Sequence, residues 1–428
     1  MLKPSPLLKS RIIGPVTLLL SSLTVALLVG EWLLRMGLPV LPPAFLIYLH
    51  PVQKEAVPTV WERIREYNPW ARGRKDDPVL GWTFEPDRLY EGRNEDGEVY
   101  SLRTSAAGFF TPDEPDAARR QLVTLGDSFM STFYVQEPLP WVLKRVTGLP
   151  VFNLAAGGWG VEQYRLAFER HAQGRNSPLV VVFTFNNDIT DVDNWRRWKA
   201  SGTRLDFMTW IWKNNPDSEI NTGNTWLDAH SLLWNYLKFS YQQLNQQLKK
   251  NPSPKDMPAE NPAELKAEHF FSGKEDGGFD LVFNGGYQFL HMEPEEFEEG
   301  GRYWPYMAAY FDALLKLKKS IEEAGGKMAL VWIPAKERVY IPLLPKDRYR
   351  NYVTTQSGRL DGLERVLRKF AEKQKISFLD LTDDLTRHAS LGEKLYFTMD
   401  GHLNSLGNRV AGEVAGAFIH GLMKGKGE

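Results

Sequence analysis

The sequence predicts a three-layer α/β/α sandwich built on a mostly parallel sheet. The chain has 428 residues, 43% hydrophobic and 25% charged, and is long enough to bury a large core. Short apolar runs, mostly separated by helix-like segments, recur along it, as is typical of buried parallel strands. These runs are LVTL (122–125), VFNLA (151–155), LVVVFTF (179–185), KMALVWIP (327–334) and ISFLDL (376–381).

Two of the segments between these runs have helical periodicity. One covers residues 294–326 and ends at a pair of glycines, and the other covers residues 358–375. Their apolar positions are Phe311, Leu314, Leu315 and Leu317 in the first and Leu363, Val366, Leu367 and Phe370 in the second.

The N-terminus predicts a membrane anchor. Residues 12–30 carry no charge, and Lys3, Lys9 and Arg11 precede them. Nineteen residues at the helical rise just span a hydrocarbon core, and the positive flank places the N-terminus inside and the rest outside. A cleaved signal peptide is the alternative, but no Ala-x-Ala site follows the run. We expect a single-pass signal anchor within residues 1–35 that holds the remaining chain on the extracytoplasmic side, periplasmic or extracellular.

The rest of the chain divides by composition. We expect a proline-broken juxtamembrane linker over 36–76, a small β-rich lead-in over 77–118 and the α/β domain over 119–425. A large insertion at about 190–300 is predicted to form a cap over the sheet, with a flexible polar connector at 251–269. Six tryptophans in the insertion suit a hydrophobic core, sugar stacking or lipid contact: Trp195, Trp198, Trp210, Trp212, Trp226 and Trp234.

The first apolar run ends in Gly-Asp-Ser. Gly126 permits a tight turn, Asp127 can brace it, and Ser128 would sit where a helix begins, with backbone N–H groups that stabilise an alkoxide or oxyanion. An ordinary N-cap serine is the simpler interpretation of this short motif alone.

A possible base and its acid lie near the C-terminus. Asp400 and His402 are two residues apart, which in an extended segment puts both side chains on one face, so the carboxylate can orient the imidazole. Asn404 or Ser405 can cap the following helix, whose apolar stripe would dock this loop on the sheet. The stripe is Val410, Ala411, Val414, Ala415 and Phe418. A surface histidine is the alternative.

Two further segments end the second and third strands. NLAAGGWG supplies Gly157, Gly158 and Gly160, whose backbone can approach a substrate closely. FTFNND supplies Asn186, Asn187 and Asp188 at the carboxyl end of a strand, where open α/β sheets bind ligands. A turn and a helix cap are the alternatives.

Composition excludes several classes. A net charge of −1 offers no field for nucleic acid, and a chain without cysteine has no disulfide or thiolate chemistry. No HExxH or other clustered-ligand motif indicates a metal site.

In order, GDS, NLAAGGWG, NND and DGH resemble the four signature blocks of the SGNH (GDSL) hydrolase superfamily, over roughly residues 120–420. The resemblance implies a flavodoxin-like sandwich without cofactor or metal. It implies Ser128 as nucleophile, His402 as base and Asp400 as its partner. The implied oxyanion donors are Ser128, Gly158 and Asn187.

The chain departs from the family pattern at three places. Phe185 stands where the third block usually has glycine, and the last block is Asp-Gly-His where Asp-x-x-His is common. That shorter spacing, with the stretch WIPAKERVYIPLLP (332–345), is similar to SGNH-like polysaccharide O-acetyltransferases of the alginate type. The block order nevertheless follows ordinary esterases, and the insertion has no counterpart in the minimal fold.

These features predict an esterase of the cell envelope that acts on acylated glycan or lipid through a Ser-His-Asp triad. A polysaccharide O-acetyltransferase is the alternative, because a sugar hydroxyl in place of water would turn hydrolysis into transfer. A non-catalytic glycan-binding or scaffold protein of the envelope is a second alternative.

Overall fold

The structure is a computed structural model that describes most of the chain. The described residues are 6–42, 45–46, 49–50, 52–53, 73–114, 119–203, 206–214, 225–248, 269–272, 280–283, 292–344, 361–398 and 400–424. They fall into two compact units. One comprises residues 1–72 and 208–255, and the other comprises residues 73–207 and 256–428.

A five-stranded parallel sheet organises the larger unit. Its strands are β5 (Leu122–Gly126), β6 (Val151–Ala155), β7 (Leu179–Thr184), β10 (Lys327–Trp332) and β11 (Ser377–Asp380). They lie in the order β11-β10-β7-β5-β6, and every neighbouring pair is parallel. This is the flavodoxin-like order, whose switch point lies between β5 and β7. All five predicted strands are present, so the predicted α/β fold is confirmed.

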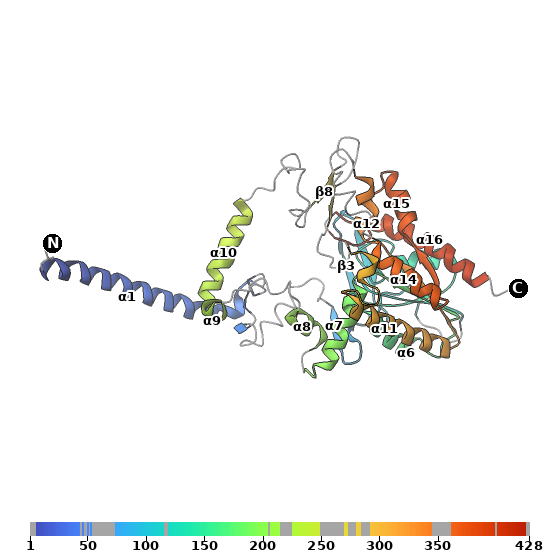
Figure 1. The fold of residues 1–428 in the computed structure, drawn as a ribbon, viewed down its shortest axis with the longest axis horizontal. Helices are drawn as coiled ribbons and strands as arrows, with labels where there is room; N and C mark the ends of the chain where they lie inside the picture. The colour runs from blue at the N-terminus through green and yellow to red at the C-terminus, as the bar shows by residue number, and fades with distance from the viewer. Residues whose placement is uncertain are drawn as a thin grey trace. The chain divides into compact units, whose positions relative to one another are not determined.

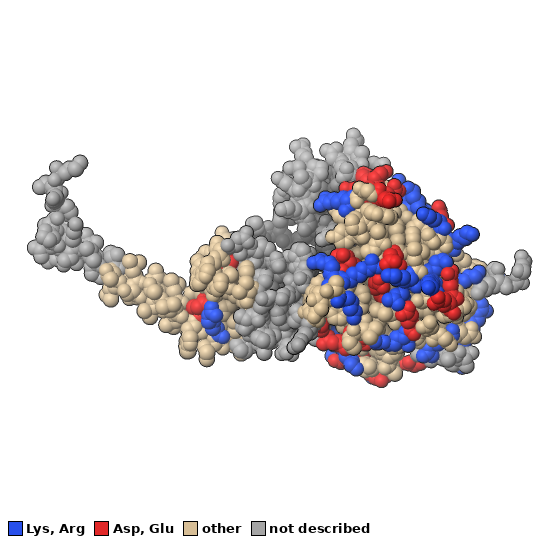
Figure 2. Space-filling model, turned by 60° about the horizontal axis from the view of Figure 1, so that its bottom comes forward, with Lys and Arg blue, Asp and Glu red and all other residues tan. Residues whose placement is uncertain are grey.

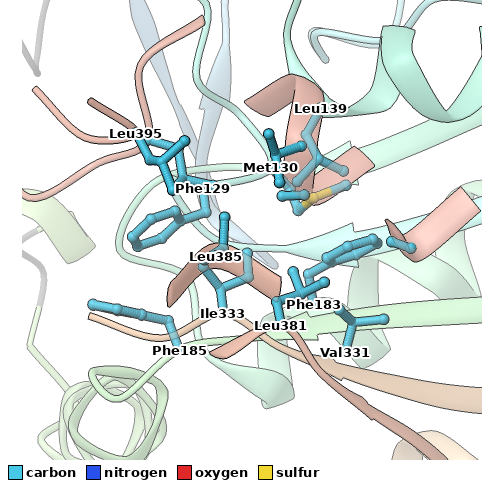
Figure 3. Close-up of a cluster of buried hydrophobic side chains, with 14 of the residues drawn as sticks. Phe129, Met130, Leu139, Phe183, Phe185, Val331, Ile333, Leu381, Leu385 and Leu395 are labelled. Carbon is cyan, nitrogen blue, oxygen red and sulfur yellow. The ribbon is translucent and has the colours of Figure 1, made fainter. Parts of the chain in front are cut away.

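Helices cover both faces of this sheet (Figure 1). One face carries α5 (Leu139–Thr147), α15 (Thr382–Ser390) and α16 (Ser405–Lys424), and the other carries α6 (Val161–His171), α11 (Trp304–Glu323) and α14 (Gly362–Lys373). Alternate strand residues face each layer, as the two-residue period of a strand requires. Val181, Phe183 and Val331, for example, belong to the core that also contains residues of α15 and α16. Figure 3 shows Phe183 and Val331 in this core.

Small residues let helices approach closely. A Cβ on Gly412 or on Gly416 would lie 2.6 Å from side-chain carbons of Val142 and Val146, respectively, so α16 fits against α5 only with glycine at both positions. On the opposite face, Phe311 of α11 and Phe370 of α14 stack with ring centroids 4.1 Å apart. Both helices were predicted from their apolar periodicity.

The β-rich lead-in forms two antiparallel hairpins. One pairs β1 (Arg74–Asp77) with β2 (Gly81–Phe84), and the other pairs β3 (Leu89–Arg93) with β4 (Val99–Arg103). The first hairpin begins three residues before the expected start of the lead-in. The remaining elements of this part of the chain follow strands of the sheet or lie within the insertion. These are α7 (Asp188–Ala200), α8 (Phe207–Asn214), β8 (His269–Ser272), β9 (Asp280–Phe283), η6 (Pro294–Glu296), α12 (Lys336–Tyr340) and η7 (Ile341–Leu343).

The smaller unit begins with α1 (Pro6–Gly37) and η1 (Leu38–Val40), and also contains α9 (Trp226–His230) and α10 (Leu232–Leu248). Within the described part of the chain, one helix is long and apolar enough to cross a membrane, at residues Thr17–Gly37, and none of that stretch is buried. Figure 2 shows the described part of this helix in tan up to the charged side chains near its end, whereas blue and red side chains intersperse on the sheet unit.

The insertion differs from the single cap that the sequence predicts. Its first helix, α7, packs against α6 and α11, whereas residues 208–255 belong to the smaller unit. Among the six tryptophans, Trp195 and Trp210 are buried, but Trp226 and Trp234 are exposed. The side chain of Trp212 and most of the connector at 251–269 lie outside the described residues.

Candidate active site

Ser128 lies just beyond the carboxyl end of β5, at the switch point of the sheet. Residues 128–131 form a turn closed by the Ser131 N–H, which donates to the Asp127 carbonyl at 3.1 Å, and the next helix, α5, begins only at Leu139. The expectation that a helix begins at Ser128 is therefore wrong. Thr132 Oγ1 donates to the Ser128 carbonyl at 2.7 Å, and bends at 134–137 separate the turn from α5.

Ser128, His402 and Asp400 form a continuous hydrogen-bonded chain. His402 Nε2 lies 2.7 Å from Ser128 Oγ, and His402 Nδ1 lies 2.5 Å from Asp400 Oδ1. The His402 N–H also donates to Asp400 Oδ1 at 3.0 Å. The fold thus brings together residues 274 positions apart in the geometry that a nucleophile, its base and an orienting acid require.

A tight loop holds the acid and the base in place. The Phe397 N–H donates to the His402 carbonyl at 3.1 Å, and a bridge pairs Tyr396 with Leu403, so the two arms of the loop are joined at its base. Asn404 Oδ1 accepts from the Gly407 N–H at 3.0 Å and caps α16. The predicted cap and apolar stripe are therefore confirmed, since Val410, Ala411 and Ala415 are buried in the core.

The electrostatics suit proton transfer. Burial by itself would lower the pKa of His402, but the adjacent Asp400 carboxylate and its hydrogen bond outweigh burial and raise this pKa. Burial opposes ionisation of Asp400, yet the charge of His402 and hydrogen bonds from His402 and Tyr134 lower the pKa of that carboxyl to about 2. Asp400 is thus a carboxylate at neutral pH, and the imidazole is held ready to accept a proton.

The glycine loop after β6 lies beside the serine. A Cβ on Gly157 would be 3.2 Å from the Ser128 Cβ, and Gly158 has a φ of +74°, which glycine adopts without strain. Gly160 lets the start of α6 approach α7, because a Cβ there would lie 2.7 Å from the Val192 nitrogen. The loop therefore brings its backbone to the nucleophile, as expected, and donation by the Gly158 N–H stays a prediction.

The Asn-Asn-Asp segment after β7 lies among buried carboxylates. Asn187 Nδ2 donates to Asp191 Oδ2 at 2.9 Å, and the Asn187 side chain also hydrogen-bonds the carboxyl of Asp127. Asp188 accepts from the hydroxyl of Tyr164 at 2.6 Å. Burial raises the pKa values of Asp127, Asp188 and Asp191. Asn187 is thus linked to the residue before Ser128, while its role as an oxyanion donor stays a prediction.

Phe185 replaces the glycine of the family pattern and belongs to the core beneath the site. Its ring centroid lies 4.4 Å from that of Phe129, whose ring lies 4.8 Å from the imidazole of His402. Figure 3 shows Phe129 and Phe185 lying next to each other at one end of the buried cluster. This departure therefore adds an apolar support below the base.

Lys336 is a site residue to which the sequence assigned no role. Its side chain is 1% exposed, and Nζ donates to the carbonyls of Phe397 at 3.0 Å, Thr398 at 3.0 Å and Asp400 at 2.9 Å. Burial lowers the pKa of Lys336 to about 8. The signal in the sequence was the stretch 332–345, where the apolar residues that follow a strand lead into this lysine.

The lead-in hairpins also reach the site. The Asp400 N–H donates to Glu95 Oε2 at 3.2 Å, and Asn94 Nδ2 donates to the Tyr134 carbonyl at 3.0 Å. Arg74 lies over the ring of Trp82 at 3.7 Å, and its Nη2 would lie 3.7 Å from a Cβ on Gly157. Sequence reasoning did not connect the lead-in with the site, because pairing between hairpin loops and distant loops leaves no periodic pattern.

The residues that the structure describes contain no group of three or more His, Cys, Asp or Glu side chains able to hold a metal ion.

Comparison with known families supports the resemblance. The model of an SGNH hydrolase-like domain, that of acetyltransferase AlgX, matches residues 294–427. The matched part contains Lys336, Asp400 and His402, whereas Ser128, Gly158 and Asn187 lie before it. This match confirms the SGNH resemblance and its similarity to the alginate-type proteins. A comparison with curated proteins returns no significant match.

Several solved structures are similar at low identity. A GDSL-like lipase from Bacteroides thetaiotaomicron is 10% identical over 72% of this chain and 92% of its own, with a TM-score of 0.32. A lipase/acylhydrolase from Enterococcus faecalis is 13% identical over 72% and 96%, with a TM-score of 0.31. An acetyl xylan esterase from Butyrivibrio proteoclasticus is 11% identical over 76% and 68%, with a TM-score of 0.28. The fold of this chain is defined by its own strand order and not by these likenesses.

Proposed function

We propose that this SGNH hydrolase-like chain is a serine-dependent esterase of the cell envelope that cleaves acyl esters of glycans or lipids. One observation carries the proposal, namely the hydrogen-bonded chain from Ser128 Oγ through His402 to Asp400. A serine is a weak nucleophile unless an adjacent base removes its proton, and this geometry supplies that base.

The first half of the reaction forms an acyl-enzyme. His402 Nε2 takes the proton of Ser128 as Oγ attacks the ester carbonyl, and Asp400 stays ionised to stabilise the imidazolium. The N–H groups of Ser128 and Gly158, with the amide of Asn187, are the proposed donors to the oxyanion. When the tetrahedral intermediate collapses, His402 gives its proton to the leaving alcohol.

The second half releases the acyl group. His402 takes a proton from water, the resulting hydroxide attacks the acyl carbon, and the proton returns to Ser128 Oγ as the carboxylic acid leaves. If a sugar hydroxyl replaces water, the same steps make a new ester and the enzyme is an O-acetyltransferase. The match to the AlgX domain favours this alternative over other acyl transfers.

The proposed location follows from α1. We infer that residues 12–30 cross the membrane with the N-terminus inside, because basic residues precede them and the first charge after them is Glu31. The sheet unit would then work on the extracytoplasmic side, where acylated polysaccharides and lipids are available.

The test uses the full-length chain in detergent with p-nitrophenyl acetate, with and without oligosaccharide acceptors. Ser128→Ala is expected to lower kcat by about 10⁴-fold or more, and Ser131→Ala, in the same turn, serves as the control. Mass spectrometry of the parent chain should find an acetyl group on Ser128. Acetyl transfer to the oligosaccharide would select the transferase over the esterase.

One result would reverse the proposal. If the folded parent chain and Ser128→Ala were equally inert toward acetyl and longer acyl esters, the binding or scaffold protein would become the better explanation.

A further inference from the structure

Helices α9 and α10 carry apolar side chains that the described residues leave uncovered. Trp226 is 71% exposed, Leu237 53% and Tyr241 65%, and Leu227 and Trp234 are exposed as well. Trp234, Leu237 and Tyr241 are spaced by three and four residues, so they share one face of α10. We call these five residues the aromatic face.

The opposite side of α10 packs inside the smaller unit. Leu232 is buried with Leu38, Phe45, Leu46 and Leu49, and Phe239 packs against the same cluster. The burial of this side fixes which side of the helix points outward. The aromatic face is therefore a surface held in place by the fold.

The start of α10 is attached directly to the end of the proposed membrane span. Glu31 Oε2 accepts from Ser231 Oγ and from the Leu233 N–H, both at 2.9 Å, and Glu31 Oε1 accepts from the Leu232 N–H at 3.1 Å. Arg35 Nη2 donates to the His230 carbonyl at 2.7 Å. Figure 1 shows α10 leaving the end of α1 crosswise, so α10 would run along the membrane surface if α1 crosses the membrane.

The charges near this face are neutralised. Between Thr225 and Tyr241 the Asp, Glu, Lys and Arg side chains are Asp228 and Lys238, which pair at 2.7 Å. Asp228 also accepts from Trp234 Nε1 at 2.9 Å and from Thr225 Oγ1 at 2.6 Å. The hydrogen bond from Lys238 and those from Thr225 hold the pKa of Asp228 well below its usual range. A paired ion is much less costly at a membrane boundary than a lone charge.

We propose that the aromatic face lies in the headgroup layer of the bilayer and forms a second membrane contact beside α1. Tryptophan and tyrosine are the residues that favour this layer, because their rings are apolar and their N–H and O–H groups reach water or headgroups. A soluble protein partner is disfavoured by position, since Glu31 ties α10 to the residue at which the uncharged run ends. The inference rests on the anchoring proposed above and is independent of the reaction.

The chain has no cysteine, so single cysteines can be introduced without removing any. The full-length protein would be reconstituted in vesicles of phosphatidylethanolamine and phosphatidylglycerol, with a spin label at Leu237→Cys. Leu20→Cys, in the proposed span, is the lipid reference, and Leu391→Cys, which is exposed on the sheet unit, is the water reference. Collisions with dissolved oxygen and with an aqueous nickel chelate would be measured at each label.

The label at 237 is expected to favour oxygen over the nickel chelate relative to the label at 391, with a ratio between the two references. A ratio at 237 equal to that at 391 would overturn the proposal while position 20 still reported lipid. Low collision rates with both reagents at 237 would also overturn it, because they indicate a protein contact. Aqueous values at 20 as well would overturn the anchor itself. Esterase activity, measured on the same samples, separates these outcomes from failure of the catalytic proposal.

Discussion

At the residue scale, Asp400 sets the proton affinity of His402. Replacing Asp400 with Asn removes the charge that raises the pKa of His402, so burial dominates and this pKa falls below its ordinary value of 6.5. The imidazole acts as a base only when neutral, and activity is therefore lost as the pH falls through this pKa. In Asp400→Asn the acidic limb of kcat/KM should move to lower pH, with kcat lowered by about 10⁴-fold.

The pH dependence of p-nitrophenyl acetate hydrolysis measures this effect. Asp384→Asn is a suitable control, because Asp384 lies on α15 and pairs with Arg387 at the surface. An acidic limb that stayed in place in Asp400→Asn would mean that another group titrates.

Tyr134 steadies the other carboxylate oxygen of the acid. Its hydroxyl donates to Asp400 Oδ2 at 3.0 Å, and its ring meets the imidazole edge-on with centroids 6.2 Å apart. Tyr134→Phe keeps the ring and removes a hydrogen bond to a charged group, which contributes about 1.5 kcal/mol. We expect kcat/KM to fall by about tenfold, with a larger loss in Tyr134→Leu. Unchanged kinetics in Tyr134→Phe would refute the role.

The sequence reached some of these residues and missed others for a physical reason. Asp400 and His402 were predicted as a pair because two-residue spacing is a local property. Tyr134 and Lys336 act through contacts with residues more than 60 positions away, 266 positions for Tyr134 and 64 for Lys336 with Asp400. Such contacts follow from the packing of loops, which has no signature in the spacing of residues.

At the scale of elements, α12 holds the loop before α16 in place. Besides the three bonds from Lys336, the Tyr340 hydroxyl donates to the Glu393 carbonyl at 2.6 Å, and Tyr396 donates to the Pro334 carbonyl at 2.8 Å. These bonds hold the segment that leads from Glu393 up to Asp400. The ammonium of Lys336 also lowers the pKa of His402 through its charge.

Lys336→Met is expected to change both the stability of the loop and the pKa of His402, and each effect has its own measurement. It leaves three loop carbonyls without their donor, so the free energy of unfolding should fall by about 3 kcal/mol. It also removes a positive charge near the imidazole, so the pKa of His402 rises and the acidic limb of kcat/KM moves to higher pH. Lys369→Met is the control, since Lys369 pairs with Glu298 at the surface and its loss should cost less than about 1 kcal/mol. If Lys336→Met lowered the free energy of unfolding but left the acidic limb of kcat/KM in place, the role of Lys336 would be structural only.

The elements themselves were largely predictable. Runs of branched apolar residues located the five sheet strands because a buried parallel strand is apolar on both faces. The helix expected at Ser128 failed because a Gly-Asp-Ser turn and a helix N-terminus share the same capping residues. Local sequence could not distinguish them, and in the structure the helix begins only at Leu139.

At the scale of the whole molecule, the insertion shows that segments adjacent in the sequence can belong to different compact units. Residues 208–255 follow the sheet strand β7 in the chain but belong to the unit that contains α1. The reason is chemical, since Glu31 caps α10 and an apolar cluster joins Leu38 and Phe45 to Leu232. These contacts join positions about 200 residues apart, which no composition boundary reveals.

The orientation of the chain across the membrane gives a last prediction. Lys3, Lys9 and Arg11 precede the uncharged run, and positive residues are retained on the cytoplasmic side. The cells are treated so that the reagent reaches the outer face of the membrane that holds the chain, while that membrane stays closed. A membrane-impermeant maleimide should then label Leu391→Cys, whereas Ser5→Cys should be labelled only after lysis. The cysteine-free parent gives the background. Labelling of Ser5→Cys alone before lysis would invert the topology, and such an enzyme would have to find its ester substrates in the cytoplasm.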